Sequence, residues 1–286
     1  MLSYIALLGR IFLIGIERII IKGLSKEDNN IIVTFLFFFL ALFFFLPFII
    51  FSKKPDDYSF LKTVIITSII YTNSFLLYVK SISISEVSLV TPLYNFNVFF
   101  LVILTSIFLD EKITIFKILG LILLIYGSSF LTKQQNFFLS IKALFNNKGS
   151  LIMIISSLLI AIGRTIDGSI TKIGVSPLFY SFFLYLFITI ILFSIILIRR
   201  KLKEIIFLLR EKTILSFLAG MTNAYSYLFL LISFKKIDVS IAEPSTMLGT
   251  IITLIFSKFI FKENIKYRFI GALIMIVGAY LIFLKF

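Results

Sequence analysis

The residues of this chain that could do chemistry are charged and polar groups placed inside long apolar runs. The sequence has no histidine and no cysteine, which excludes imidazole bases, thiol nucleophiles and the commonest metal ligands. A charged or amide group inside a membrane span is costly, so it serves either function or bonding between helices. Each such group has both interpretations, and we expect no cofactor and no metal.

Glu243 is the strongest single candidate for a functional group. It lies in an apolar stretch immediately before Pro244, and burial favours the neutral form of a carboxyl group. Such a carboxyl group could exchange a proton or bind a cation. The alternative is a structural carboxylate that pairs with a nearby arginine.

Arg164 is the arginine that could pair with Glu243 in that second interpretation. Arg164 and Asp167 are three residues apart, which places them on one face of a helix where they could simply pair with each other. If the end of the sixth apolar run and the start of the ninth lie on one side of the membrane, Arg164 could instead reach Glu243. The two side chains would then form an ionic gate.

Arg10 lies near the middle of the first apolar run, where a lone arginine has no route to the lipid headgroups. It shares a helix face with Glu17 and could bind a carboxylate or phosphate of a substrate. The alternative is that the first span is misplaced. Glu17 and Arg18 would lie near Thr91 at the opposite end, as the counterpart of the gate, although Arg18 could also extend to the headgroups.

Four asparagines fall near the middle of apolar runs, and their amides could hydrogen-bond a polar solute in a central cavity. The structural alternative is bonding between helices, which contributes on average about 0.6 kcal/mol each. The four are Asn73, Asn95, Asn97 and Asn223.

Pro92 and Pro244 each lie about one turn inside a predicted helix. Proline removes a backbone hydrogen bond and exposes a carbonyl on the preceding turn, so both helices are expected to kink. Kinks at matching positions of two repeats point to a substrate pathway, whereas a proline in the first turn of a helix is ordinary.

The elements that must position these groups are membrane helices. The chain is 60% hydrophobic and 15% charged, and a helix needs about 20 apolar residues to cross a bilayer. The first run is expected to be a retained span and not a cleaved signal peptide. Ten windows qualify: 2–21, 31–51, 60–79, 87–109, 114–132, 150–171, 178–198, 213–234, 239–261 and 267–284.

The chain also repeats itself, which is its most informative feature. Residues 87–92 read VSLVTP and residues 239–244 read VSIAEP, and a glutamate follows each proline by nineteen residues. Other matches keep nearly the same offset, so the series indicates a duplication. They are Glu111 and Glu263; Gly120 with Gly127, and Gly271 with Gly278; Thr72-Asn73 and Thr222-Asn223; Glu17 with Lys22, and Asp167 with Lys172.

Five spans in each copy form an odd number, so the second copy must enter the membrane from the opposite side. The predicted fold is therefore an all-α membrane protein with a 5+5 inverted repeat, a pattern typical of secondary transporters. The predicted boundaries are 1–132 for the first repeat, 133–149 for a connection that could form a short amphipathic helix at the interface, and 150–286 for the second repeat. The paired glycines are expected to let the fifth and tenth spans pack closely, and Glu111 and Glu263 to be structural.

The sequence resembles the drug/metabolite transporter superfamily, in its EamA type with two tandem repeats, over nearly the whole chain. The resemblance rests on Pro92 with residues 109–111 (LDE), Glu243-Pro244 with residues 261–263 (FKE), the glycine pairs, and Gly15 followed by Lys22. Two positions depart from the family pattern. Ile14 stands where an aromatic residue is frequent, and Thr91 stands where a glutamate often precedes the proline.

The resemblance implies a multi-pass protein of the cell (inner) membrane with both termini in the cytoplasm. The formal charge of +14 does not indicate nucleic-acid binding, because the basic residues lie in short gaps between apolar runs. Their distribution contradicts the implied orientation, since positive residues favour the cytoplasm and the larger set would face outward. That set is Arg199, Arg200, Lys201, Lys203, Arg210, Lys212, Lys258, Lys262, Lys266 and Arg268.

The leading functional prediction is a secondary transporter, and by the resemblance an exporter, of small polar metabolites such as amino acids or related compounds. The expected partners are a small-molecule substrate and the lipid bilayer, and the chain is expected to be a monomer or homodimer. The alternatives are a channel or a non-transporting membrane protein, and more weakly a membrane-embedded enzyme that modifies lipids. Saturable counterflow would separate a carrier from all of these.

Overall fold

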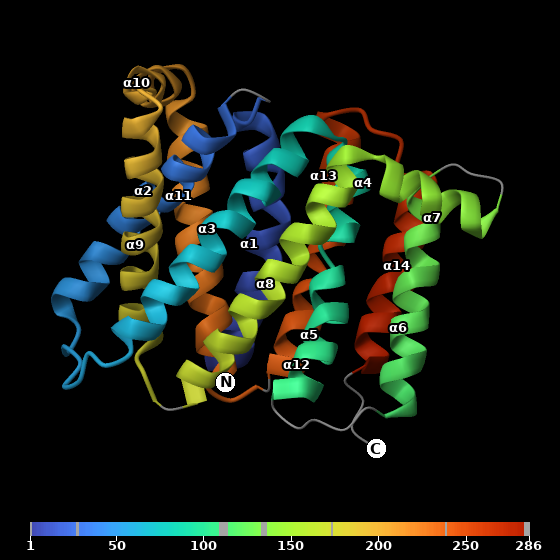
Figure 1. Ribbon diagram of the computed structural model, residues 1–286, viewed down its shortest axis with the longest axis horizontal. Coiled ribbons are helices and arrows are strands. Elements are labelled where there is room, and N and C mark those ends of the chain that lie inside the picture. Colours follow the sequence, from blue (N-terminus) through green and yellow to red (C-terminus); the bar gives the residue numbers. More distant parts are fainter. Residues whose placement is uncertain are drawn as a thin grey trace.

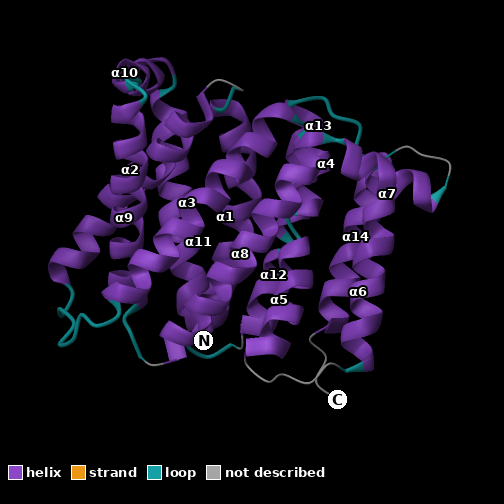
Figure 2. Cartoon of the chain, in the orientation of Figure 1, coloured by secondary structure: helices purple, strands orange, loops and turns teal. Residues whose placement is uncertain are grey.

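A computed structural model describes residues 2–26, 29–108, 114–132, 136–172, 174–237 and 239–282. All regular structure in these ranges is helical (Figure 2). The elements are α1 (Leu2–Leu24), α2 (Asn30–Phe51), α3 (Leu61–Ile84), α4 (Val87–Leu93), α5 (Phe96–Phe108), α6 (Ile115–Ser128), η2 (Ser129–Leu131), α7 (Phe137–Asn146), α8 (Lys148–Lys172), α9 (Pro177–Ile198), α10 (Leu202–Glu211), α11 (Thr213–Phe234), α12 (Val239–Thr246), α13 (Gly249–Ile260) and α14 (Lys266–Ile282).

The described part of the chain contains six helical segments that are long and apolar enough to cross a membrane: 30–51, 61–84, 87–108, 148–171, 177–198 and 213–234. α1 has a comparable length but carries Arg10, Glu17, Arg18 and Lys22. Large apolar side chains also cover much of the outer surface; Ile198, for example, is 81% exposed. A bundle that is apolar inside and outside is suited to lipid, so the chain is a multi-pass membrane protein. The predicted count of ten crossings stays a prediction.

In each of the windows predicted around Pro92 and Pro244, a two-residue turn interrupts the α-helix while the chain keeps its course, because Asn95 N–H still donates to the Pro92 carbonyl over 3.0 Å and Leu248 N–H to the Ser245 carbonyl over 3.2 Å. α4 ends at Leu93 and α5 begins at Phe96, while α12 ends at Thr246 and α13 begins at Gly249. Each interruption follows shortly after the proline, whose missing N–H leaves a carbonyl one turn earlier without its helical partner. The Ser157 hydroxyl donates to the Met153 carbonyl of its own helix over 2.8 Å and lies 3.3 Å from the carbonyl oxygens of Leu93 and Tyr94, so α8 packs against the first interruption.

Helices from the first part of the chain pack mainly against helices from the second part, in matching pairs. α1 packs on α11 and α13, and α8 packs on α3 and α5. Likewise α2 lies against α9, and α6 against α14. In Figure 1, α1 begins at the lower end of the bundle, where α14 also ends, whereas α8 begins at the upper end. The first helices of the two parts therefore run in opposite directions.

The paired glycines do bring α6 and α14 together, as expected. A Cβ atom on Gly271 would lie 2.7 Å from the carbonyl oxygen of Gly127, and one on Gly278 would lie 2.8 Å from that of Gly120. Real Cβ atoms do not approach backbone oxygen so closely, so these positions need glycine for the helices to touch.

Two short helices, α7 and α10, lie at the upper end of the bundle (Figure 1). α7 confirms the short amphipathic helix expected within 133–149, since Phe138 and Phe145 are exposed while Ser140 and Leu144 are buried. Residues 133–135 of that connection lie outside the described ranges. The sequence does not predict α10, because the basic residues of this segment are typical of a loop between two spans.

Candidate functional site

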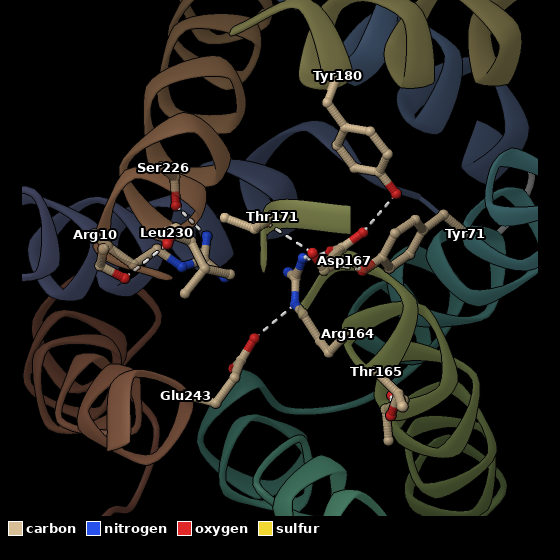
Figure 3. Close-up of polar contacts among 12 residues, drawn as sticks. Arg10, Tyr71, Arg164, Thr165, Asp167, Thr171, Tyr180, Ser226, Leu230 and Glu243 are labelled. Atoms are coloured by element: carbon tan, nitrogen blue, oxygen red, sulfur yellow. Dashed lines mark hydrogen bonds and ion pairs between the residues drawn. The ribbon is translucent and has the colours of Figure 1, made fainter. Parts of the chain in front are cut away.

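Arg164 is the centre of a buried polar cluster (Figure 3). α8 places it three residues before Asp167, and its Nη1 atom donates to Asp167 Oδ2 over 2.9 Å. Its Nε atom lies 2.6 Å from Glu243 Oε1 on α12. The N–H is not aligned with that oxygen, so the second contact is an ion pair without a hydrogen bond. Arg164 therefore makes both of the contacts that its sequence position allowed.

Two tyrosines complete the cluster around Asp167. The hydroxyls of Tyr71 and Tyr180 donate to the two oxygens of this carboxylate, over 2.6 and 2.9 Å, and Tyr71 accepts from Arg164 over 3.0 Å. The Arg164 guanidinium lies 5.4 and 5.1 Å from the ring centres of Tyr71 and Tyr227, within cation–π range. These contacts hold the guanidinium in place from three helices.

A glycine makes room for this arrangement. A Cβ atom on Gly163 would lie 2.5 Å from the Tyr71 ring, so a side chain there would displace the ring from Asp167. Gly163 immediately precedes Arg164, and the tyrosine therefore packs directly against the backbone of α8.

Glu243 is the least satisfied member of the cluster. It is 1% exposed, and neither of its carboxylate oxygens has a hydrogen bond to the part of the chain that the structure describes. Asp167, by contrast, accepts on both oxygens. Because a buried carboxylate is stable only when it is paired and hydrogen-bonded, Glu243 depends on its ion pair with Arg164, whereas Asp167 has three hydrogen-bond donors.

A small internal cavity adjoins the cluster and is lined from both parts of the chain. Its free volume is about 10 Å³, which is on the order of one water molecule. The lining combines charged groups with aromatic rings and an amide: Arg10, Ile14, Glu17, Phe75, Tyr78, Tyr94, Arg164, Tyr185, Asn223 and Tyr227. In this conformation the cavity is closed and too small for a metabolite.

Arg10 lies in the middle of α1 and is buried, so a helix does cover the predicted window; that α1 crosses the membrane stays a prediction. Its Nη1 atom donates to the Ser226 hydroxyl on α11, while its Nε atom has no partner among the described residues. Glu17 lines the same cavity. The described core holds three buried arginines and three buried carboxylates, so its charges can balance: Arg10, Arg18, Arg164, Glu17, Asp167 and Glu243.

In the opposite half of the bundle the described residues form no ion pair that is buried on both sides, because Arg268 pairs with Glu86, whose side chain is 55% exposed. Arg18 donates to the Thr250 hydroxyl over 3.1 Å and lies 4.8 Å from the ring centre of Tyr94. The contact expected between Thr91 and the Glu17–Arg18 pair is not made, and the buried Thr91 hydroxyl has no partner in the described ranges. A threonine cannot replace the charge of Glu243, so the two ends are held by different chemistry.

The asparagines divide into different roles. The prediction for Asn73 is wrong, because its side chain is exposed on the outside of α3 and donates to the Ile69 carbonyl of its own helix. Asn223 lines the cavity, but its amide is already occupied by the Phe37 carbonyl at 2.9 Å and the Tyr185 hydroxyl at 2.6 Å. It connects α2, α9 and α11.

Asn95 lies in the interruption after Pro92, and Asn97 lies in the first turn of α5. Both are buried, and each keeps one polar atom, Nδ2 and Oδ1 respectively, without a hydrogen bond in the described part of the chain. The hydroxyl of Thr250 donates to Asn95 Oδ1 over 3.4 Å. Pro244 lies in α12, at the position in that helix that corresponds to Pro92 in α4.

A second, open pocket of about 940 Å³ lies at the upper end, between the starts of α4 and α14. Charged side chains in this pocket form hydrogen bonds with backbone groups at helix ends. The Glu263 carboxylate accepts from the backbone N–H groups of Val87 and Ser88, over 2.9 and 2.7 Å. Lys22 donates to the carbonyls of Ile82, Ser83 and Ser85, over 2.8, 3.2 and 2.6 Å. Glu263 is thus structural, as expected; Glu111 lies outside the described residues.

The tyrosines of the site could not be predicted from the sequence. Tyr71, Tyr180, Tyr185 and Tyr227 are buried polar groups, but a chain with 36 phenylalanines and 12 tyrosines gives no local signal that distinguishes a functional ring from a packing one. Only the pairing of Tyr71 and Tyr180 with Asp167 separates them. Among the described residues, no three acidic side chains come together in a way that could hold a metal ion.

Comparisons with known proteins agree with this architecture. A solved structure described as "Crystal structure of protein" is similar to the chain with a TM-score of 0.64, over 99% of this chain and 97% of that one, at 9% sequence identity; this likeness concerns the fold alone. No curated protein matched. The family described as "EamA-like transporter family" matches residues 1–133 and again residues 147–284. The chain belongs to the EamA-like transporter family.

Proposed function

We propose that this protein is a secondary transporter that moves small polar metabolites, such as amino acids or related compounds, by alternating access. The observation that carries the proposal is the closed cavity at the centre of an apolar bundle, lined by charged and aromatic side chains from both parts of the chain. A site for a polar solute between two opposed sets of helices is what alternating access requires.

The paired interruptions α4/α5 and α12/α13 support the same mechanism. Discontinuous helices at matching positions of two repeats commonly form the solute and ion sites of secondary transporters. In the proposed topology ten helical segments cross the membrane as a 5+5 inverted repeat, and the two sets rock against each other around the cavity. With a free volume of about 10 Å³, the present conformation is closed around the site, so a solute enters only after one end has opened.

The two ends would open by different chemistry. The Arg164–Glu243 ion pair joins α8 to α12 at the lower end, and in the proposal it acts as the gate there. The upper end is held by the hydrogen bond from the charged Arg18 guanidinium to Thr250, by the Glu263 contacts at the start of α4 and by the Arg268–Glu86 ion pair, and it carries the open pocket. Protonation of Glu243, or its occupation by a cation, would weaken the pair and favour opening of the lower end, which couples the gate to an ion gradient.

The chemistry of the cavity supports a small amphoteric solute. Arg10 can meet a carboxylate, Glu17 can meet an ammonium group, and the rings of Tyr94, Tyr185 and Tyr227 offer apolar walls with polar edges. Amino acids and related compounds have this combination of groups. We further propose that both termini are cytoplasmic in the cell membrane and that the direction is export, as the family pattern implies; the Lys/Arg distribution opposes this orientation.

Counterflow in proteoliposomes tests the function. Purified protein is reconstituted with a panel of unlabelled amino acids, nucleosides and organic acids inside the vesicles, and uptake of the matching labelled solute is measured against empty vesicles. The proposal predicts saturable exchange confined to one class of small polar solutes. Current without saturable exchange would show a channel, and the absence of exchange across the whole panel would contradict the proposed substrate class.

A further inference from the structure

α10 is a helix that does not run along the bundle. It connects α9 to α11 and lies across the upper end, where Figure 1 shows it nearly end-on while α9 stands upright below it. Its ten residues, Leu202–Glu211, are far too few to cross a bilayer, which needs about 20. If α9 and α11 are membrane spans, α10 lies at the level of the headgroups.

The outer surface of α10 is apolar. Leu202, Ile206 and Phe207 are 42%, 56% and 61% exposed, whereas Leu208 on the inner face is 4% exposed. The helix therefore packs on the bundle with one face and presents large apolar side chains on another. Such side chains are costly in water, but they are suited to the boundary between headgroups and acyl chains.

The same surface is strongly basic. Residues 199–212 contain six basic and two acidic side chains. One basic side chain, Lys201, pairs with Glu204 at 3.0 Å, and another, Lys212, donates to the carbonyl of Gly23. The remaining four are exposed and have no ionic or hydrogen-bond partner in the part of the chain that the structure describes: Arg199, Arg200, Lys203 and Arg210.

We propose that α10, together with Arg199 and Arg200, is a docking surface for anionic lipid headgroups in the leaflet at the upper end. Exposed apolar side chains beside uncommitted arginine and lysine match an anionic headgroup above an acyl chain, since the positive charges attract the headgroup and the apolar groups enter the layer beneath it. A soluble anionic partner would satisfy the charges and leave Leu202, Ile206 and Phe207 in water.

The residues that follow α10 connect the proposed docking surface to two helices of the bundle. Its last residue but one is Arg210, and Lys212, directly after the helix, donates to the carbonyl of Gly23 near the end of α1. α11 begins at Thr213 and carries Tyr227 of the cavity. A lipid bound on α10 would therefore hold the upper ends of α1 and α11, two helices that line the cavity.

The chain has no tryptophan, so Phe207→Trp creates a single fluorescent probe on the proposed surface. The variant is placed in lipid nanodiscs of phosphatidylcholine with a small fraction of either dansyl-phosphatidylglycerol or dansyl-phosphatidylcholine. Quenching by lipids brominated along their acyl chains is measured in parallel. An Asp56→Trp probe, at an exposed position in the loop between α2 and α3 (the side chain is 90% exposed), serves as the matched control at the other end.

The proposal predicts quenching of the probe at 207 by brominated lipid, and energy transfer to the anionic dansyl lipid about threefold above that to the zwitterionic one. The Asp56→Trp probe should show neither effect. Combining Arg199→Gln, Arg200→Gln, Lys203→Gln and Arg210→Gln should remove the headgroup preference. Removing the same charge at the lower end, with Lys53→Gln, Lys54→Gln, Lys235→Gln and Lys236→Gln, should preserve it.

Three results would overturn the proposal. Accessibility of the probe at 207 to aqueous iodide, without quenching by brominated lipid, would place α10 in water. Equal energy transfer to both dansyl lipids would show that the surface does not select anionic headgroups. Displacement of the anionic lipid by excess inorganic phosphate would show a site for free anions in place of a lipid site. None of these measurements depends on the transport activity.

Discussion

The Arg164 guanidinium lies 2.6 Å from the Glu243 carboxylate, and this ion pair joins α8 to α12 inside an apolar bundle. The two partners are unequal. Arg164 is also held by Asp167 and Tyr71, whereas Glu243 has no hydrogen bond to any described residue. Neutralisation of Glu243 would thus release the pair while leaving Arg164 anchored on α8, which is the property required of a gate that opens at one end.

Replacement of Glu243 by glutamine should separate exchange from coupling. Glutamine keeps the shape of the side chain but cannot exchange a proton, so Glu243→Gln should retain solute counterflow and lose accumulation driven by an ion gradient. Both activities are measured in the same proteoliposome preparation, with and without an imposed gradient. A variant that still accumulates solute against its gradient would show that coupling resides elsewhere.

A double-mutant cycle should show that Arg164 and Glu243 interact energetically. Arg164→Gln leaves two buried carboxylates without their cation and should cost about 3–5 kcal/mol, the typical cost of breaking a buried pair. Glu243→Gln should cost less, because the arginine keeps Asp167 and Tyr71. The second substitution should have a smaller effect once the first is present. Thermal stability of the four proteins in detergent measures the cycle, and strictly additive losses would mean that the contact contributes nothing.

Close packing of α6 on α14 should depend on glycine at a specific site. Gly271→Ala places a methyl group against the Gly127 carbonyl and should destabilise the protein by about 1–3 kcal/mol, as overpacking does. Gly23→Ala is the control, because a Cβ there would meet only Leu215 at an ordinary 3.7 Å. Comparison of their thermal stability in detergent tests the interface, and equal stability of the two variants would contradict it.

Orientation can be measured because the chain has no cysteine. Single cysteines at Asn146, which is exposed at the end of α7, and at Lys54, in the loop between α2 and α3, report opposite ends of the bundle. With both termini in the cytoplasm, a membrane-impermeant maleimide should label Asn146→Cys in intact cells and Lys54→Cys only after permeabilisation. The reverse pattern would show that the Lys/Arg distribution decides the topology.

Much of the fold could be predicted from the sequence, because apolar runs of about 20 residues occur mainly in membrane-spanning helices. The matching glycine pairs also predicted the α6–α14 contact. α10 could not be predicted, because its five apolar side chains from Ile205 to Leu209 are too short a run to indicate a span, and its charges are typical of a loop. The interruptions after Pro92 and Pro244 were predicted only as kinks, since proline does not by itself determine how far the ladder opens.

The charged residues of the site could be predicted from the sequence, but its neutral polar residues could not. A buried arginine or carboxylate stands out in an apolar run, which is how Arg10, Glu17, Arg164, Asp167 and Glu243 were found. The duplication misled at Asn73, because a sequence match does not specify how each copy is rotated about its axis. Thr72 and Thr222 do behave alike, with hydroxyls that donate to the carbonyls of Ser68 and Leu218 in their own helices.

A kinetic comparison of two tyrosine variants tests whether the solute contacts the central cavity. The Tyr227 hydroxyl lines it and has no hydrogen bond to the described residues, so Tyr227→Phe removes only a group available to a solute. Tyr225→Phe makes the same change two residues away, where the ring packs against Phe44 and Phe48. Tyr227→Phe should raise the KM of counterflow by about fivefold to tenfold, the effect of one lost hydrogen bond, while Tyr225→Phe should leave it unchanged. Equal KM values for both variants and the wild type would contradict the placement of the transport site in this cavity.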